Sequence, residues 1–146
     1  MSTIGRMRPV HLLIIEDNPG DVRLLQEAFD ELRANVKIQV AKDGAEGMAV
    51  VAGTIPGKEG SPDLILLDLN LPKVSGHDVL VKLKSDPRTR HIPVIILTSS
   101  RAESDVHRAY QSHANAYLRK PSTLEGLLNT VRDVKSFWME TAILPG

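Results

Sequence analysis

The residue best placed for chemistry is Asp68, which directly follows four consecutive apolar residues, 64–67. A short apolar run of this kind is typical of a parallel strand that is buried on both faces. Ligands bind outside the carboxyl ends of such strands, so Asp68 lies where a reactive group is expected. Asp is also common at the start of turns. This stretch alone therefore leaves a chemical role and a turn both open.

The ends of the other predicted strands carry polar side chains that belong to the same sheet edge: Glu16 and Asp17 after 10–15, Thr98 after 92–97, and Lys120 after 115–119. Three carboxylates brought within a few ångströms raise one another's pKa and call for a cation. Hard oxygen ligands with room for water suit Mg²⁺. A carboxylate in this setting is able to act as a nucleophile and form an aspartyl phosphate. The ion, Lys120 and Thr98 would then each hold one phosphoryl oxygen.

Each of these residues also has an ordinary structural interpretation. Glu16 and Asp17 could simply end a strand in a turn, and Thr98 or Ser99 could cap the following helix. Lys120 could be a surface lysine before a turn. All of them falling on one edge of one sheet by chance is much less expected, so the pattern favours a phosphoryl-transfer site.

The apolar periodicity predicts five strands and five helices in strict alternation. Strands are predicted at 10–15, 36–40, 64–67, 92–97 and 115–119, and helices follow them, ending near 33, 51, 85, 112 and 140. This alternation predicts an α/β fold with a doubly wound, five-stranded parallel sheet and right-handed crossovers. The natural strand order at this size is 2-1-3-4-5. We expect residues 1–146 to form a single domain with its core at about 10–140.

Helical spacing predicts which residues of the first and last helices face the core. These are Leu24, Leu25, Ala28, Phe29 and Leu32 in the first helix, and Leu124, Leu127, Leu128, Val131, Val134 and Trp138 in the last. The segment 53–62 contains three Gly and two Pro, which predicts a loop.

Composition restricts the classes of function. Lys plus Arg equals Asp plus Glu, at 18 each, which is not typical of a nucleic-acid binder. No apolar run is long enough to span a membrane, and residues 1–9 lack the apolar core of a signal peptide. There is no Cys, which fits a reducing compartment, and we expect a cytoplasmic protein. Only 26 residues follow Lys120, so we expect the output to be a protein–protein contact.

These motifs together resemble the receiver domain of two-component response regulators. The resemblance runs from Val10 to about Trp138 and rests on Glu16-Asp17, Asp68-Leu69-Asn70-Leu71-Pro72, Gly76, Thr98-Ser99 and Lys120-Pro121. More narrowly, the stretches 16–21, 53–62 and 85–93 are similar to those of the small regulators that partner bacterial phytochromes.

The resemblance implies a flavodoxin-like receiver fold in which Asp68 accepts phosphate from a histidine of a sensor histidine kinase, with a bacteriophytochrome as one such partner. Mg²⁺ would be held by Asp17, Asp68 and the backbone carbonyl of Asn70, and Glu16 would assist through a water. It further implies that Thr98 and Tyr117 form a switch pair and that Lys120 contacts the phosphoryl group. The Lys120–Pro121 peptide bond is expected to be cis.

Two surfaces are candidate interfaces. Pro19, Val22 and Gln26 lie beside the acidic loop, on the side of the first helix where a phosphohistidine must approach, although a solvated helix edge is the alternative. By resemblance, the usual output face is expected to support a homodimer through Val106, Tyr110, Tyr117, Arg119, Asp133 and Phe137. The alternative for Phe137 is that it folds back over the core.

Two other functions compete with a stand-alone phosphoacceptor that dephosphorylates itself slowly and is not an enzyme. An aspartate-nucleophile phosphatase would use a related Asp-x-Asp motif, but Asn70 replaces its second Asp and no cap domain is present. A pseudo-receiver that only binds partners usually lacks the acceptor, an acid or the lysine. None of these is missing here.

Overall fold

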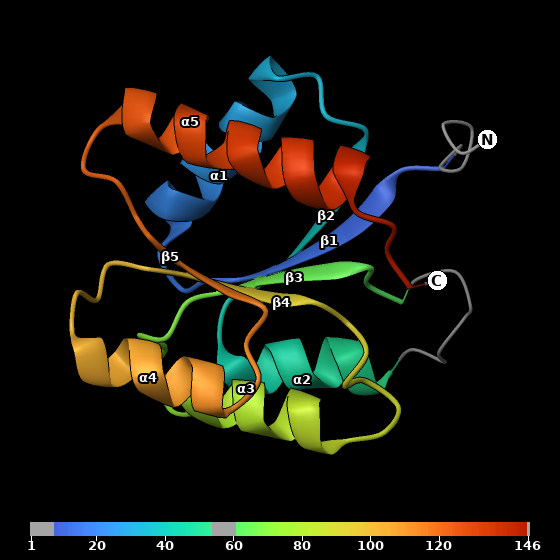
Figure 1. Cartoon of the computed structure of the whole chain (residues 1–146), viewed down its shortest axis with the longest axis vertical. Coiled ribbons are helices and arrows are strands. Elements are labelled where there is room, and N and C mark those ends of the chain that lie inside the picture. The colour runs from blue at the N-terminus through green and yellow to red at the C-terminus, as the bar shows by residue number, and fades with distance from the viewer. Residues whose placement is uncertain (1–7, 54–60, 146) are drawn as a thin grey trace.

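A computed structural model describes residues 8–53 and 61–145, and within them a parallel sheet lies between two layers of helices (Figure 1). The strand order is β2-β1-β3-β4-β5, as the sequence predicts. The strands are β1 (Val10–Ile15), β2 (Val36–Ala41), β3 (Leu64–Leu67), β4 (Val94–Thr98) and β5 (Ala116–Arg119). The helices are α1 (Pro19–Glu31), α2 (Gly44–Ala52), α3 (Gly76–Ser85), α4 (Glu103–Gln111) and α5 (Leu124–Val134). Most of the segment predicted as the loop 53–62 lies outside the described residues.

The central strands are apolar on both faces because both faces of the sheet are covered. Helices α1 and α5 cover one face, and α2, α3 and α4 cover the other (Figure 1). Alternate residues of β1 therefore join different cores: Leu12 and Ile14 pack with α1 and α5, whereas Leu13 and Ile15 pack on the opposite side. The strand ends that carry polar residues are thus anchored by two separate apolar layers.

Four of the five α-helices begin with a capping side chain. Asn18, Asp43, Ser75 and Thr123 each accept a hydrogen bond from a backbone N–H in the first turn. The exception is α4, where Ala102 occupies the cap position and makes no side-chain cap bond. Neither Thr98 nor Ser99 caps this helix, so that interpretation of the two residues is wrong.

The predicted apolar faces of α1 and α5 hold except at one leucine in each helix. Leu24 is 38% exposed and Leu124 is 57% exposed, so their assignment to the core is wrong. Both line a groove between α1 and the start of α5, which leaves their side chains partly uncovered. Leu25, Phe29, Leu127 and the other predicted positions pack against the core as expected.

The last helix is not α-helical throughout. After Val134 the chain continues as a π-helical segment, η2 (Lys135–Thr141), rather than as the single α-helix predicted to about residue 140. Trp138 is half-buried against the core, whereas Phe137 is exposed. Their rings lie edge to face with centroids 5.1 Å apart.

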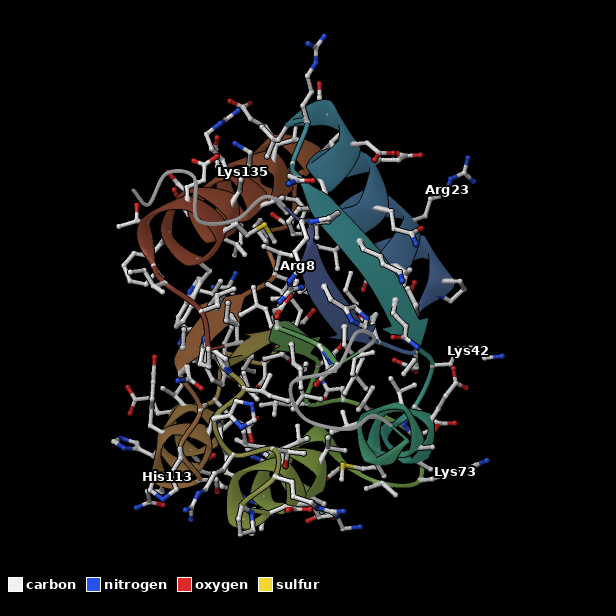
Figure 2. The ribbon with its side chains drawn as sticks, turned by 90° about the vertical axis from the view of Figure 1, so that its right-hand side faces the viewer. Arg8, Arg23, Lys42, Lys73, His113 and Lys135 are labelled. Atoms are coloured by element: carbon white, nitrogen blue, oxygen red, sulfur yellow. The ribbon has the colours of Figure 1, made fainter. Side chains whose placement is uncertain are left out.

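Charged residues are spread over the surface. Figure 2 shows Arg23, Lys42 and Lys73 extending away from the ribbon, and all three are exposed. Among the described residues, no helix combines the length and the apolarity that a membrane crossing requires.

Candidate functional site

The parallel register brings the carboxyl ends of four strands together. The backbone N–H of Asp68 donates to the carbonyl of Ile15 at 3.0 Å, which fixes the end of β3 beside the end of β1. On the other side, the N–H of Lys120 donates to the carbonyl of Thr98 at 2.8 Å. Side chains that are far apart in the sequence therefore share one sheet edge.

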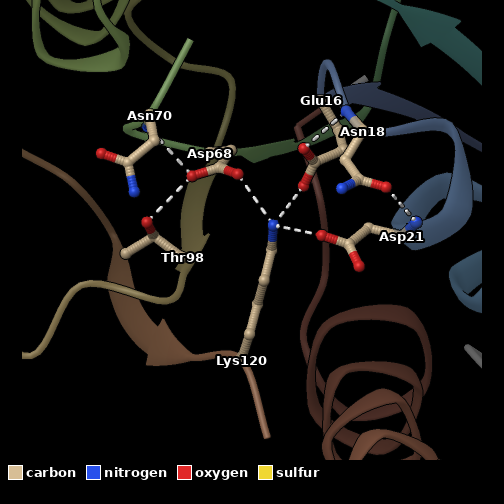
Figure 3. Close-up of polar contacts among 7 residues, drawn as sticks. All are labelled: Glu16, Asn18, Asp21, Asp68, Asn70, Thr98 and Lys120. Carbon is tan, nitrogen blue, oxygen red and sulfur yellow. Dashed lines mark hydrogen bonds and ion pairs between the residues drawn. The ribbon is translucent and has the colours of Figure 1, made fainter. Parts of the chain in front are cut away.

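Asp68 is buried, and both of its oxygens are held (Figure 3). Oδ1 accepts from the backbone N–H of Asn70 at 3.0 Å and from the Thr98 hydroxyl at 2.9 Å. Oδ2 accepts from the ammonium of Lys120 at 2.8 Å. The carboxylate is therefore fixed in one orientation, as a positioned nucleophile must be.

Lys120 contacts two further carboxylates besides that of Asp68. It forms an ion pair with Glu16 and donates to Asp21 Oδ2 at 3.0 Å (Figure 3). No role at this site was predicted for Asp21 from the sequence. The signal was its place in the first turn of α1, directly after the acidic loop, so the turn points back toward the strand ends.

Burial and pairing act in opposite directions on the acids of this site. Burial raises the pKa of Glu16 to about 7, because the loss of water outweighs its contacts with Lys120 and the Asn18 N–H. Burial also acts to raise the pKa of Asp68. Its contacts with Lys120, Asn70 and Thr98 outweigh burial and place that pKa below the ordinary value. Asp68 is thus the carboxyl that the site keeps ionised.

The same contacts govern Lys120. Burial acts to lower its pKa, but the three carboxylates that accept its hydrogen bonds outweigh burial and raise the pKa. The lysine is therefore held as a cation, which makes it a fixed positive charge rather than a proton donor.

The predicted acidic cluster is present. One oxygen each from Glu16, Asp17 and Asp68 lies within 4.8 Å of the others. The ammonium of Lys120 contacts the carboxyl groups of Glu16, Asp21 and Asp68, and Asp17 is exposed beside Glu16. This donor set fits a hard divalent cation.

Gly76 packs against the backbone of Asp68. A Cβ at this position would lie 2.2 Å from the carbonyl oxygen of Asp68 and 2.5 Å from Leu69 Cα. No side chain fits there, so the start of α3 packs directly on the backbone that carries Asp68.

Tyr117 lies on β5, half-buried against the core that includes α3 and α4. Its hydroxyl donates to the carbonyl of Ser100 at 3.2 Å. Because Ser100 is two residues after Thr98, the two residues predicted as a switch pair are joined through one short loop. The backbone N–H of Tyr117 donates to the hydroxyl of Tyr110 at 3.1 Å, which covers part of the sheet edge.

The residues predicted for the output face come from α4, from the edge strand β5, from the end of α5 and from η2. Tyr110 and Phe137 are 49% and 53% exposed, so Phe137 does not fold back over the core. Arg119 and Asp133 are exposed, whereas Val106 and Tyr117 are half-buried.

The expectation of a cis bond between Lys120 and Pro121 is wrong. No described peptide bond is cis. The trans form is the intrinsically preferred one for X–Pro, by about 0.5–1 kcal/mol. The backbone N–H and the ammonium of Lys120 make their site contacts with the trans bond in place.

The predicted kinase-docking residues lie at the open side of the site. Pro19 and Gln26 are exposed on α1 and Val22 is half-buried. Next to them, a groove of about 230 Å³ lies between α1 and the start of α5, with Lys120 at one end. Leu24 and Leu124, the two leucines that do not reach the core, line this groove.

Comparison with known proteins agrees with the resemblance to receiver domains found in the sequence. Residues 12–132 match the model of the response regulator receiver domain. Response regulator Rcp1 of Synechocystis sp. is 39% identical over 138 residues, which cover 94% of both proteins. The crystal structure of its Mn²⁺-bound form superposes with a TM-score of 0.85 and covers 94% of this chain and 100% of that one.

Two other relatives are similarly close. The phosphorylated cyanobacterial phytochrome response regulator RcpA has a TM-score of 0.86 at 39% identity, covering 94% of this chain and 99% of its own. The probable methanogenesis regulatory protein FilR2 of Methanothrix harundinacea is 38% identical, over 94% of this chain and 89% of its own.

The chain therefore belongs to the response regulator receiver domain family. It is a response regulator of a two-component system, and the flavodoxin-like receiver fold expected from its sequence is confirmed.

Proposed function

We propose that residues 1–146 act as a single receiver that takes a phosphoryl group from a sensor histidine kinase onto Asp68. The observation that carries this proposal is the state of Asp68, which is buried, ionised and held at both oxygens. A turn-forming aspartate would need neither the lysine nor the threonine.

The transfer would proceed as follows. An oxygen of Asp68 attacks the phosphorus of a phosphohistidine, the P–O bond forms, and the P–N bond breaks with its electron pair returning to the imidazole. In the unphosphorylated structure, Lys120 and Thr98 each contact one oxygen of the Asp68 carboxylate. We propose that both contacts move to phosphoryl oxygens as charge leaves the carboxylate. No protein group has to give or take a proton, which fits a lysine whose pKa is raised.

Mg²⁺ is the proposed cofactor, held by Asp17, Asp68 and the backbone carbonyl of Asn70, with Glu16 assisting through a water. The support is the carboxylate cluster and the Mn²⁺-bound form of Rcp1. When bound, the ion would neutralise charge on the phosphoryl oxygens and so permit an anion to enter an acidic site.

A small phosphodonor separates this function from the two competing ones. Incubation with Mg²⁺ and acetyl phosphate should give a stable acyl phosphate that decays slowly, as expected of a signalling protein rather than an enzyme. Rapid continuous release of phosphate would indicate a phosphatase. The absence of any label, with and without Mg²⁺, would indicate a pseudo-receiver.

The partner we propose is a histidine kinase in the cytoplasm, and a bacteriophytochrome is the first one to test because RcpA is a phytochrome response regulator. The docking surface is Pro19, Val22 and Gln26 together with the groove that Leu24 and Leu124 line. Apolar side chains left uncovered beside an active site are typical of a partner interface.

Val22→Asp and Gln26→Glu should slow transfer from the kinase and leave acetyl phosphate labelling unchanged. Equal slowing of both reactions would contradict docking.

We further propose a two-fold dimer through Val106, Tyr110, Tyr117, Arg119, Asp133 and Phe137. The support is that two of the chain's five aromatic residues, Tyr110 and Phe137, are about half exposed there. Phe137→Asp should leave the thermal midpoint unchanged and shift sedimentation toward the monomer. A wild-type protein that sediments as a monomer at tens of micromolar, with and without a phosphoryl mimic, would contradict the dimer.

A further inference from the structure

A chain of polar side chains joins α3 to α4. His77, the second residue of α3, is 5% exposed, and its Nε2–H donates to Asp105 Oδ1 at 3.0 Å. The hydroxyl of Ser100 donates to the other oxygen of Asp105 at 2.5 Å. A carboxylate only accepts hydrogen bonds, so the imidazole must carry its proton on Nε2. Nδ1 is buried and has no hydrogen-bond partner within the described residues.

Both ends of this chain reach the acceptor. His77 directly follows Gly76, which packs on the backbone of Asp68. Ser100 follows Thr98 by two residues, and the Thr98 hydroxyl donates to Asp68 at 2.9 Å. The contacts therefore form a closed ring that starts at Asp68, passes through α3, α4 and the loop after β4, and returns to Asp68.

Helix α4 has little else to fix its first turn. Its cap residue is Ala102, and no side chain among the described residues caps it. The structure describes every residue of α4, and among them Ala109 alone is buried. Asp105 in the first turn is held as a carboxylate, since contacts with Ser100 and then His77 keep its pKa below the ordinary value. Polar contacts rather than packing thus determine where α4 begins.

We propose that His77 is a positioning residue that, through Asp105 and Ser100, latches the loop 99–102 and the first turn of α4 in their unphosphorylated arrangement. This proposal rests on the function proposed for Asp68. When Thr98 leaves Asp68 for a phosphoryl oxygen, the loop that it begins must shift, and Ser100 carries that shift to Asp105 and to the hydroxyl of Tyr117. The latch therefore opposes switching, and its removal moves the equilibrium toward the phosphorylated arrangement.

The test uses a broken latch, a restored one and a matched control. His77→Leu removes the donor, and Asp105→Ala removes the centre of the latch at a half-exposed position where folding is not at risk. His77→Gln can still donate to Asp105 from nearly the same place. The control is His11→Leu, because His11 is 6% exposed and bonds Gln39 Oε1 at 2.9 Å, yet lies near the amino end of β1.

The first measurement is amide hydrogen exchange without any phosphodonor. The N–H of Ala102 donates to the Ser100 hydroxyl at 3.3 Å and reports on the loop. We expect exchange of the Ala102 N–H to be faster by about tenfold in His77→Leu and Asp105→Ala, as expected for a loss of ~1.4 kcal/mol. His77→Gln and His11→Leu should both match the wild type there. Wild-type exchange in both broken variants would contradict the latch, as would equal acceleration in His11→Leu.

The second measurement is the affinity for beryllium fluoride, a phosphoryl mimic, in the presence of Mg²⁺. The broken variants should bind it about three- to tenfold more tightly, and His77→Gln should return to the wild-type value. Unchanged or weaker binding in the broken variants would contradict a latch that opposes switching. If the wild-type protein takes no label from acetyl phosphate, the proposed function fails. The exchange result remains valid in either case, so the two failures are distinguishable.

Discussion

Helices α1 and α4 both border the site, but the sequence holds them in different ways. Asn18 caps α1, Pro19 begins it, and three of its residues are buried against the core. Helix α4 has no side-chain cap in the described structure and buries Ala109 alone. Apolar packing therefore fixes the side of the site that carries Glu16, Asp17 and Asp21, whereas polar contacts fix the side that follows Thr98. The difference indicates that the α1 side is rigid enough to hold the charged residues in place. The α4 side can move when the charge at the site changes.

The largest expected difference between the two helices is in core stability. Phe29→Ala in α1 should lower the free energy of unfolding by about 3–5 kcal/mol, because it leaves a cavity in a fully buried position. Ala109→Gly in α4 should cost about 1–2 kcal/mol, through helix propensity and the loss of one buried methyl group. Denaturant unfolding of both variants measures this. Similar losses in the two variants would remove the basis of the comparison.

The next effect is the pH dependence of folding stability, which we expect Glu16 to cause on the α1 side of the site. Its folded pKa of about 7 exceeds the ordinary 4.5, so the folded protein binds the extra proton between these values. Stability of the metal-free protein should therefore fall as the pH rises through that window, by about 1.4 kcal/mol per pH unit, and level off above it.

Two controls sharpen this pH prediction. Glu16→Gln should flatten the slope because the titrating group is gone. Added Mg²⁺ should also flatten it, since a cation favours the ionised carboxyl. If the unfolding free energy of the metal-free protein rises with pH across the same window, the pKa of Glu16 is not raised by burial in the folded protein.

The smallest effect concerns the helix caps. Asn18→Ala should destabilise the protein by about 1 kcal/mol through the lost bond to the Asp21 N–H. Ala102→Ser should stabilise it by about 0.5–1 kcal/mol, because the extended backbone at Ala102 suits a capping hydroxyl. Thermal unfolding of the two variants measures both shifts. Destabilisation by Ala102→Ser would mean that α4 is already satisfied in some other way.

The sequence was sufficient to predict the fold and which residues meet at most of the candidate site. Three buried strands, β1, β3 and β4, and the half-buried edge strand β5 all end at polar residues. The parallel topology brings those ends together, and Glu16, Asp17, Asp68 and Lys120 therefore meet. Periodicity could not show that Leu24 and Leu124 lie uncovered, since it gives the direction of a side chain and not the extent of the neighbouring helix.

Contacts between separate elements could not be predicted from the sequence for a different reason. The bond between His77 and Asp105 depends on how close α3 and α4 approach, and the contact of Asp21 with Lys120 depends on the tilt of α1 over the sheet edge. Neither distance follows from local residue types. The peptide bond before Pro121 was predicted from family resemblance alone, and that prediction failed.

Asp68 itself offers the most direct test of the whole account. Asp68→Asn keeps the shape of the side chain and removes the nucleophile, and the variant should remain folded. After incubation with Mg²⁺ and acetyl phosphate, intact-mass and peptide analysis of the wild type should find one acid-stable, base-labile phosphate on Asp68, and the variant should carry none. A variant that acquires the same label at the wild-type stoichiometry would show that Asp68 is not the acceptor.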